Sequence, residues 1–137
     1  MVANIKATWK NGNLFFAENE AGGKAELGGE NIRPMEMILA SLAGCTGVDI
    51  VNILKKKRVK FSDLQIKVSG MRTNTHPKVY TDIHVTYLIW GEGIKEKDVE
   101  KAIHLSEDKY CSVSAMLKST AKIHSDYQIL APNEREE

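Results

Sequence analysis

The sequence stretch that most constrains the fold runs from Pro34 to about Lys57, is interrupted only by Gly44 and Gly47, and predicts one long helix. Pro34 suits the first turn of a helix, because the N–H group that proline lacks has no partner there. At 1.5 Å per residue the helix would be roughly 35 Å long. Polar residues three or four positions apart form a single stripe on it: Ser41, Cys45, Asp49, Asn52 and Lys56. The rest of its circumference is apolar and must be covered on most sides.

A chain of 137 residues has the size of one domain and leaves little material to wrap such a helix. A second subunit is the natural cover, so the sequence predicts a homodimer. The alternative is a central helix sandwiched by the sheet of its own chain. In both cases we expect a single domain over residues 1–137, with a disordered tail over about residues 131–137.

The remaining segments alternate between strand and helix patterns. Before the long helix, alternating residues predict strands at 5–10, 14–17 and 24–27. After it we expect strands at 64–71 and 79–90, joined by a hairpin loop at His76 and Pro77. An amphipathic helix at 95–109, a short helix or continuation at 111–118 and a last strand at 121–130 complete the pattern. Runs of strands and helices in this order predict an α+β fold.

Composition and charge exclude several classes of function. A formal net charge of +1 argues against a nucleic-acid partner, which would need a basic excess. The sequence does not show the basic start and following apolar run of a signal peptide, so we expect a cytoplasmic protein. The longest apolar stretch, Met37 to Val51, is interrupted by Ser41, Thr46 and Asp49, and is expected to be too short and too polar to span a membrane.

The two cysteines, Cys45 and Cys111, are the residues best suited to chemistry. Cytoplasmic thiols are kept reduced, so a structural disulfide is not expected. The sequence has no CxxC motif and no His/Cys cluster, so no metal site is expected either. Small residues flank Cys45 and leave room beside its sulfur, whereas Cys111 stands where a short helix could begin and stabilise a thiolate. Alternatively, each cysteine simply fills space in the core.

The surroundings of both cysteines resemble those of a known family. Residues 34–49, PMEMILASLAGCTGVD, resemble the helix motif of the OsmC/Ohr hydroperoxide reductases, and residues 107–114, EDKYCSVS, resemble the segment with their second cysteine. The separation of 66 residues also suits the family, and the order of strands and helices matches from Ile5 to Leu130. The details are most similar to the YhfA-type branch.

This resemblance implies an OsmC-like fold of antiparallel strands around a long central helix, in an intertwined homodimer. It also implies a thiol peroxidase that reduces small organic hydroperoxides to alcohols in oxidative-stress defence. Cys45 would attack the peroxide and become a sulfenic acid, and Cys111 would condense with it to a disulfide. An external thiol reductant, a lipoyl dithiol in one branch, would restore both thiols, and no metal or organic cofactor is needed.

The sequence departs from the family pattern at two positions. The family glutamate precedes the first cysteine by ten residues, where this chain has Met35. Glu36 is the nearest acid, but on a continuous helix it lies about 180° from Cys45. It could reach the sulfur if the helix begins after it; otherwise it is an ordinary first-turn acid that the helix dipole favours. In place of the family arginine the chain offers Lys10 or Arg33 as a group that orients the thiolate and the peroxide.

Two alternatives to a peroxidase therefore stay open. One is a non-catalytic binding module that holds an apolar ligand at the dimer interface. The other is a thiol enzyme of the same fold that acts on a different sulfur substrate.

Overall fold

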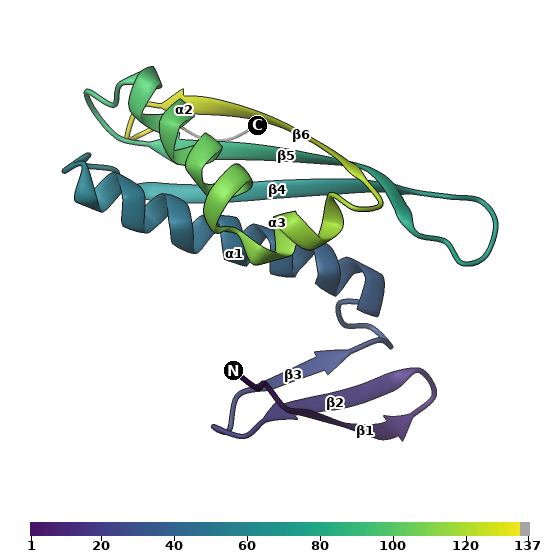
Figure 1. Cartoon of the computed structure of the whole chain (residues 1–137). Helices are drawn as coiled ribbons and strands as arrows, with labels where there is room; N and C mark the ends of the chain where they lie inside the picture. The colour runs from purple at the N-terminus through teal and green to yellow at the C-terminus, as the bar shows by residue number, and fades with distance from the viewer. Residues whose placement is uncertain (135–137) are drawn as a thin grey trace. The chain divides into compact units, whose positions relative to one another are not determined.

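The structure is a computed structural model and describes residues 1–134. The chain divides into two compact units, residues 1–38 and 39–137. A division by contacts does not decide how many domains fold independently, so the single domain expected over residues 1–137 stays a prediction. Within residues 1–134 the strands form two sheets of three strands each, β1-β2-β3 and β4-β5-β6 (Figure 1).

The first unit is an antiparallel meander of β1 (Ile5–Asn11), β2 (Leu14–Asn19) and β3 (Lys24–Leu27). Phe16 pairs with Thr8 on one side and with Glu26 on the other. The turn after β3 requires glycine at position 28, where φ is +85° and an added Cβ would lie 2.1 Å from the Asn13 carbonyl oxygen. The alternating pattern of the sequence therefore predicted these strands to within two residues at each end.

The helix α1 (Pro34–Lys56) has the predicted start and ends one residue before the predicted end. Within α1 the fully buried residues recur at every fourth position: Leu42, Thr46, Ile50 and Leu54. They form one stripe, which is offset by one residue from the polar stripe of the sequence. The chain thus covers α1 along a single stripe and not on most sides.

Within residues 1–134, α1 is also the one helix that is long and apolar enough to cross a membrane by length and composition. The whole helix is longer than the apolar stretch Met37–Val51, so its length and composition alone do not exclude a membrane span. The core helix of a soluble protein meets the same criterion. The expected absence of a membrane partner stays a prediction.

The second unit is built on β4 (Asp63–Arg72), β5 (Tyr80–Trp90) and β6 (Lys122–Leu130). Alternate residues of β5 lie in the core on one face of the sheet: Ile83, Val85, Tyr87 and Ile89, all at most 1% exposed. Leu88, Trp90 and Leu130 form a small cluster on its other face. The helix packs closely on β4, since a Cβ added to Gly47 would lie 3.1 Å from Ile66 Cδ1.

Three helical segments connect β5 to β6 (Figure 1): α2 (Glu96–Leu105), the π-helix η1 (Ser106–Tyr110) and α3 (Ser112–Leu117). They return the chain to the end of the sheet at which β5 began. For that reason β6 pairs with β5 in parallel, with Tyr87 opposite Tyr127. The α+β, OsmC-like fold class is confirmed, but the expectation of antiparallel strands is wrong for this one pair.

One further detail differs from the sequence prediction. The amphipathic segment 95–109 is not one helix, because its regular part ends at Leu105 and a π-helix follows. Residues 131–134 form a turn in which the Glu134 carbonyl accepts a 2.8 Å hydrogen bond from the Trp90 indole, and the disorder expected over residues 131–137 stays a prediction. Residues 135–137 of that predicted tail lie outside the described part of the chain.

Candidate thiol site

Cys45 and Cys111 are both free thiols and belong to the second unit. Cys45 lies in the middle of α1 and is partly exposed. Cys111 is 3% exposed and is the N-cap residue of α3. Its backbone leaves the helical region (φ −76°, ψ 106°), and its sulfur accepts a hydrogen bond from the Ser114 N–H at 3.3 Å. A side chain that accepts from the third helical residue is the ordinary geometry of an N-cap.

The fold brings the two thiols into contact. Burial, followed by a hydrogen bond with the Cys45 side chain, raises the pKa of the Cys111 thiol to about 11. The N–H groups of Ser114 and Val113 act in the opposite direction, because they stabilise a thiolate at the start of α3. Cys111 therefore keeps its proton at neutral pH while the pair is reduced.

The π-helix η1 precedes Cys111 directly and holds it in place. The Cys111 N–H donates to the Ser106 carbonyl oxygen five residues earlier, at 2.7 Å. The Ser106 hydroxyl, which is fully buried, donates to Asp49 Oδ2 at 2.9 Å. Asp49 lies one helical turn after Cys45, so this hydrogen bond ties the cysteine-bearing part of α1 to the segment that leads into Cys111.

A partly buried hydrogen-bond network around Glu107 supports the same segment. The Tyr87 hydroxyl donates to Glu107 Oε2 at 2.6 Å, and the Ser125 hydroxyl donates to the same oxygen. The Glu107 carbonyl oxygen accepts from Ser114 Oγ at 3.3 Å and from Lys118 Nζ at 2.7 Å. Burial and the neighbouring Glu107 carboxylate raise the pKa of Tyr87 far above its usual range, so its hydroxyl stays a donor.

Sequence reasoning did not single out Tyr87, Ser106 or Glu107 as site residues. Glu107 lies inside the segment that resembles the family motif, and that position could have suggested a role. Tyr87 lies in an apolar strand and Ser106 in an amphipathic helix pattern, and neither carries a local signal. Their importance comes from contacts with residues 20 and 57 positions away.

The three residues predicted to orient the thiolate and the peroxide belong to the first unit. Glu36 Oε1 accepts a hydrogen bond from the Arg33 backbone N–H at 2.9 Å, which is the backward contact of a helix capping box. Lys10 Nζ lies 5.2 Å from the centre of the Phe16 ring. Because the two units are not placed relative to one another, a role for Glu36, Arg33 or Lys10 beside the thiols stays a prediction.

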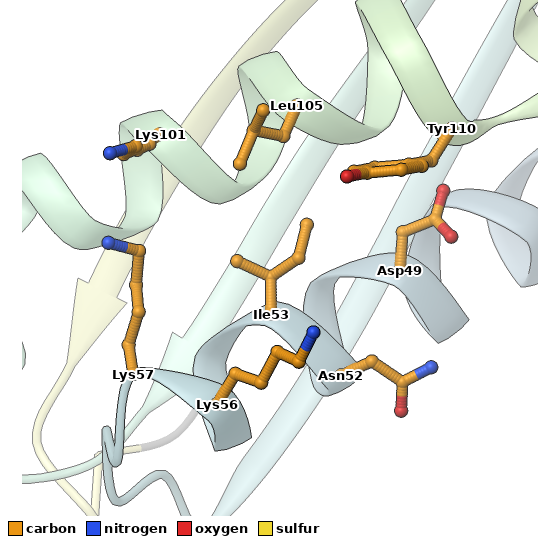
Figure 2. A pocket seen from close by; sticks show the side chains of 8 residues that line it. All are labelled: Asp49, Asn52, Ile53, Lys56, Lys57, Lys101, Leu105 and Tyr110. Atoms are coloured by element: carbon orange, nitrogen blue, oxygen red, sulfur yellow. The ribbon is translucent and has the colours of Figure 1, made fainter.

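An open cleft of about 740 Å³ lies beside the thiol site (Figure 2). It begins at Asp49 and Tyr110, which are close in sequence to the two cysteines, and extends along the C-terminal half of α1 and past α2. Its lining is Asp49, Asn52, Ile53, Lys56, Lys57, Lys101, Leu105 and Tyr110. Among residues 1–134, no group of three or more His, Cys, Asp or Glu side chains could hold a metal ion.

The fold and the site together define an α+β protein with two thiols in contact. A family model described as OsmC-like protein matches residues 27–126, which is most of the chain. The chain therefore belongs to the OsmC-like family, and the resemblance seen in the sequence is confirmed.

Individual relatives agree with this assignment. Protein YhfA of Escherichia coli K12 is 33% identical over 135 residues, which cover 96% of this chain and 99% of YhfA. A hypothetical protein from Aquifex aeolicus VF5 has a similar structure, with a TM-score of 0.89 and 34% identity over 96% of this chain and 98% of its own. The organic hydroperoxide resistance protein OhrB of Bacillus subtilis shares the fold, with a TM-score of 0.63 and 13% identity over 93% of this chain and 98% of OhrB.

Proposed function

We propose that this protein is a cysteine-based peroxidase that reduces small organic hydroperoxides to alcohols. The observation that carries the proposal is the contact between Cys45 and Cys111, in which one thiol is partly exposed and the other is buried and protonated. Two thiols in contact suit a reaction that alternates between a dithiol and a disulfide. Membership of the OsmC-like family supports this chemistry, and OhrB is named for resistance to organic hydroperoxides.

In the first step Cys45 attacks the peroxide. Cys111 keeps its proton and is 3% exposed, whereas Cys45 is open to an incoming molecule, so Cys45 is the better nucleophile of the pair. The Cys45 thiolate forms an S–O bond to one peroxide oxygen while the O–O bond breaks. The other oxygen leaves as an alkoxide, takes up a proton and becomes the alcohol, and Cys45 is left as a sulfenic acid.

In the second step Cys111 resolves the sulfenic acid. The Cys45 side chain contributes to the raised pKa of Cys111 both by its hydrogen bond and by its charge. Conversion of Cys45 to an uncharged sulfenic acid removes the charge effect, while the Ser114 and Val113 N–H groups still favour a Cys111 thiolate. Cys111 then forms the disulfide and water leaves.

An external dithiol reductant returns the disulfide to two thiols and becomes oxidised itself; a lipoyl dithiol is one candidate. The proposal needs no metal or organic cofactor. We further propose that the protein is a cytoplasmic homodimer that acts in oxidative-stress defence. Glu36, Arg33 and Lys10 are the candidates for orienting the peroxide.

If Cys45 attacks the peroxide and Cys111 resolves the sulfenic acid, the serine variants of the two cysteines should lose different steps of the reaction. Cys45→Ser should consume no cumene hydroperoxide, because a hydroxyl is not ionised at neutral pH. Cys111→Ser should consume one equivalent and leave a sulfenic acid that dimedone traps, and excess peroxide should convert it to sulfinic acid. The wild type should lose two hydrogens per chain and gain a Cys45–Cys111 disulfide, as read by intact and peptide mass spectrometry. Ser112 is an exposed neighbour of Cys111, so Ser112→Ala is the matched control and should behave as the wild type.

Three outcomes would contradict the proposal in different ways. If Cys111→Ser is inactive and Cys45→Ser keeps one turnover, the two roles are reversed. If both variants consume peroxide as the wild type does, the thiols are not the reactive groups. If the wild type consumes no peroxide and forms no disulfide, the protein is a binding module or acts on another sulfur substrate.

A further inference from the structure

The cleft beside the thiol site has a lining that the peroxidase chemistry does not require. Its volume of about 740 Å³ falls in the range of small-molecule sites, roughly 300–1,000 Å³. Two segments distant in sequence form it, the C-terminal half of α1 and the α2–η1 segment (Figure 2).

Positive charge dominates one end of this cleft. Lys57 directly follows α1 and Lys101 comes from α2, and their ammonium groups lie at the same end of the cleft (Figure 2). Lys56, the last residue of α1, points the other way, past Ile53 toward Asn52. Lys57 Nζ lies 3.8 Å from Asp98 Oδ1 and is partly neutralised. Lys56 and Lys101 form no ion pair with any residue in the described range 1–134.

The one carboxylate of the lining does not balance this charge. Asp49 lies at the opposite end of the cleft and its Oδ2 already accepts the Ser106 hydroxyl. A cation at the end of α1 is favourable by itself, because the helix dipole stabilises it there. That explanation does not extend to Lys101, whose position in the middle of α2 brings a further charge to the same cavity.

Apolar side chains line the space between Lys57 and Lys101 at one end of the cleft and Asp49 at the other. Ile53 of α1 and Leu105 of α2 extend toward each other in this part of the cleft, and the Tyr110 ring lies beyond them (Figure 2). Tyr110 is 51% exposed, so its ring is available to a bound molecule. An apolar body placed here gains roughly 0.8 kcal/mol for each buried CH₂ group.

We propose that this cleft binds an anionic amphipathic small molecule, with a carboxylate or phosphate head between Lys57 and Lys101 and an apolar body against Ile53, Leu105 and Tyr110. Lysine recognises either head as a point charge, so the shared chemistry is an anion joined to a chain or ring. This site is distinct from the thiol pair and does not depend on the proposed peroxidase activity.

Isothermal titration calorimetry of the full chain with three matched probes tests the proposal. Octyl phosphate and octanoate carry the two candidate heads, and octanol carries the same chain without a charge. We expect at least one anion to bind about tenfold more tightly than octanol, a difference of about 1.4 kcal/mol. The preference between the two anions identifies the head, and the advantage over octanol should shrink as salt is added.

Lysine variants locate the site. The double variant Lys57→Gln/Lys101→Gln should lower the affinity for the preferred anion about tenfold and leave the affinity for octanol unchanged. Lys55→Gln/Lys97→Gln is the matched control, because it removes two exposed lysines, one from α1 and one from α2, that lie outside the cleft lining. The proposal is overturned if no probe binds, if octanol binds as tightly as the anions, or if the control variant weakens binding equally.

Discussion

Two opposing sets of interactions act on the protonation state of the Cys111 thiol. Burial and the Cys45 side chain favour its protonated form, while the N–H groups at the start of α3 favour the thiolate. The first influences dominate in the reduced protein, so the folded state holds the Cys111 proton more tightly than the unfolded chain does. The stability of the fold must then depend on pH in the range where this thiol titrates.

The direction of that dependence follows from the two pKa values. The thiol has a pKa of about 9.0 without its environment and about 11 in the folded protein. Between these values the unfolded chain binds fewer protons than the native chain, so the free energy of unfolding falls as pH rises. The contribution is fully present below pH 9.0 and is lost as pH rises to about 11.

We therefore expect the urea midpoint of the reduced wild type to fall over this range more steeply than that of Cys111→Ser. Tyr87 and Tyr127 also have raised pKa values, but both variants retain them, so the difference between the two profiles isolates the thiol. Parallel profiles would show that the fold does not hold the Cys111 proton.

At the scale of elements, η1 joins the two parts of the thiol site. It carries Ser106, which contacts α1 through Asp49, and Glu107, which contacts β5 through Tyr87. Its main chain also fixes Cys111, because the Cys111 N–H donates to Ser106. A single π-helical turn therefore connects the central helix, the sheet and the second cysteine, and such turns are frequent at functional sites.

Ser106→Ala tests this connection. The substitution removes the hydroxyl that donates to Asp49 Oδ2 and leaves the carboxylate with solvent as its partner. We expect a loss of about 1–2 kcal/mol in the free energy of unfolding, since a hydrogen bond to a charged group is the stronger kind. Urea denaturation gives the value, and disulfide formation after one equivalent of peroxide should also slow because α1 and η1 are less firmly joined.

The exposed Ser112 supplies the control for that measurement. Ser112→Ala alters a serine near the same cysteine without breaking a contact to α1, and its effect should stay within about 0.5 kcal/mol. Equal losses for both variants would mean that the Ser106–Asp49 hydrogen bond does not stabilise the site.

Local patterns predicted the strands and helices, but long-range contacts decided the details of the site. Alternation and the position of Pro34 located β1 to β3 and α1 almost to the residue. The π-helix was missed because its register depends on Glu107 meeting Tyr87 and Ser125, which no local pattern contains. The parallel β5–β6 pair was missed for a related reason, since it depends on where the α2–α3 connection returns the chain. Likewise, the family resemblance and not the spacing of 66 residues implied that Cys45 and Cys111 meet.

At the scale of the whole molecule, one side of α1 is left uncovered by the chain, and this side bears on the oligomeric state. The buried stripe comprises four of the 23 residues of α1, and Val48 on another side is 61% exposed. Around Val48 lies an open hollow of about 430 Å³ with a mostly apolar lining: Gly44, Gly47, Val48, Val51, Asn52, Leu64 and Ile66. Met116 of α3 is 74% exposed as well. Apolar surface of this kind on a small protein is typical of an interface between subunits.

We accordingly predict a homodimer in which this side of α1 is buried. Light scattering at low micromolar concentration should give twice the chain mass of 15.3 kDa. Val48→Glu places a charge in the apolar hollow, where an unpaired carboxylate is costly to bury, and should shift the protein toward monomer. Lys55→Glu introduces the same carboxylate at an exposed position of α1 outside the hollow and should remain a dimer.

A wild type that is a folded monomer at these concentrations would refute the dimer, because an interface that covers α1 would bind far more tightly. A Val48→Glu variant that stays dimeric would place the interface on another surface of the chain.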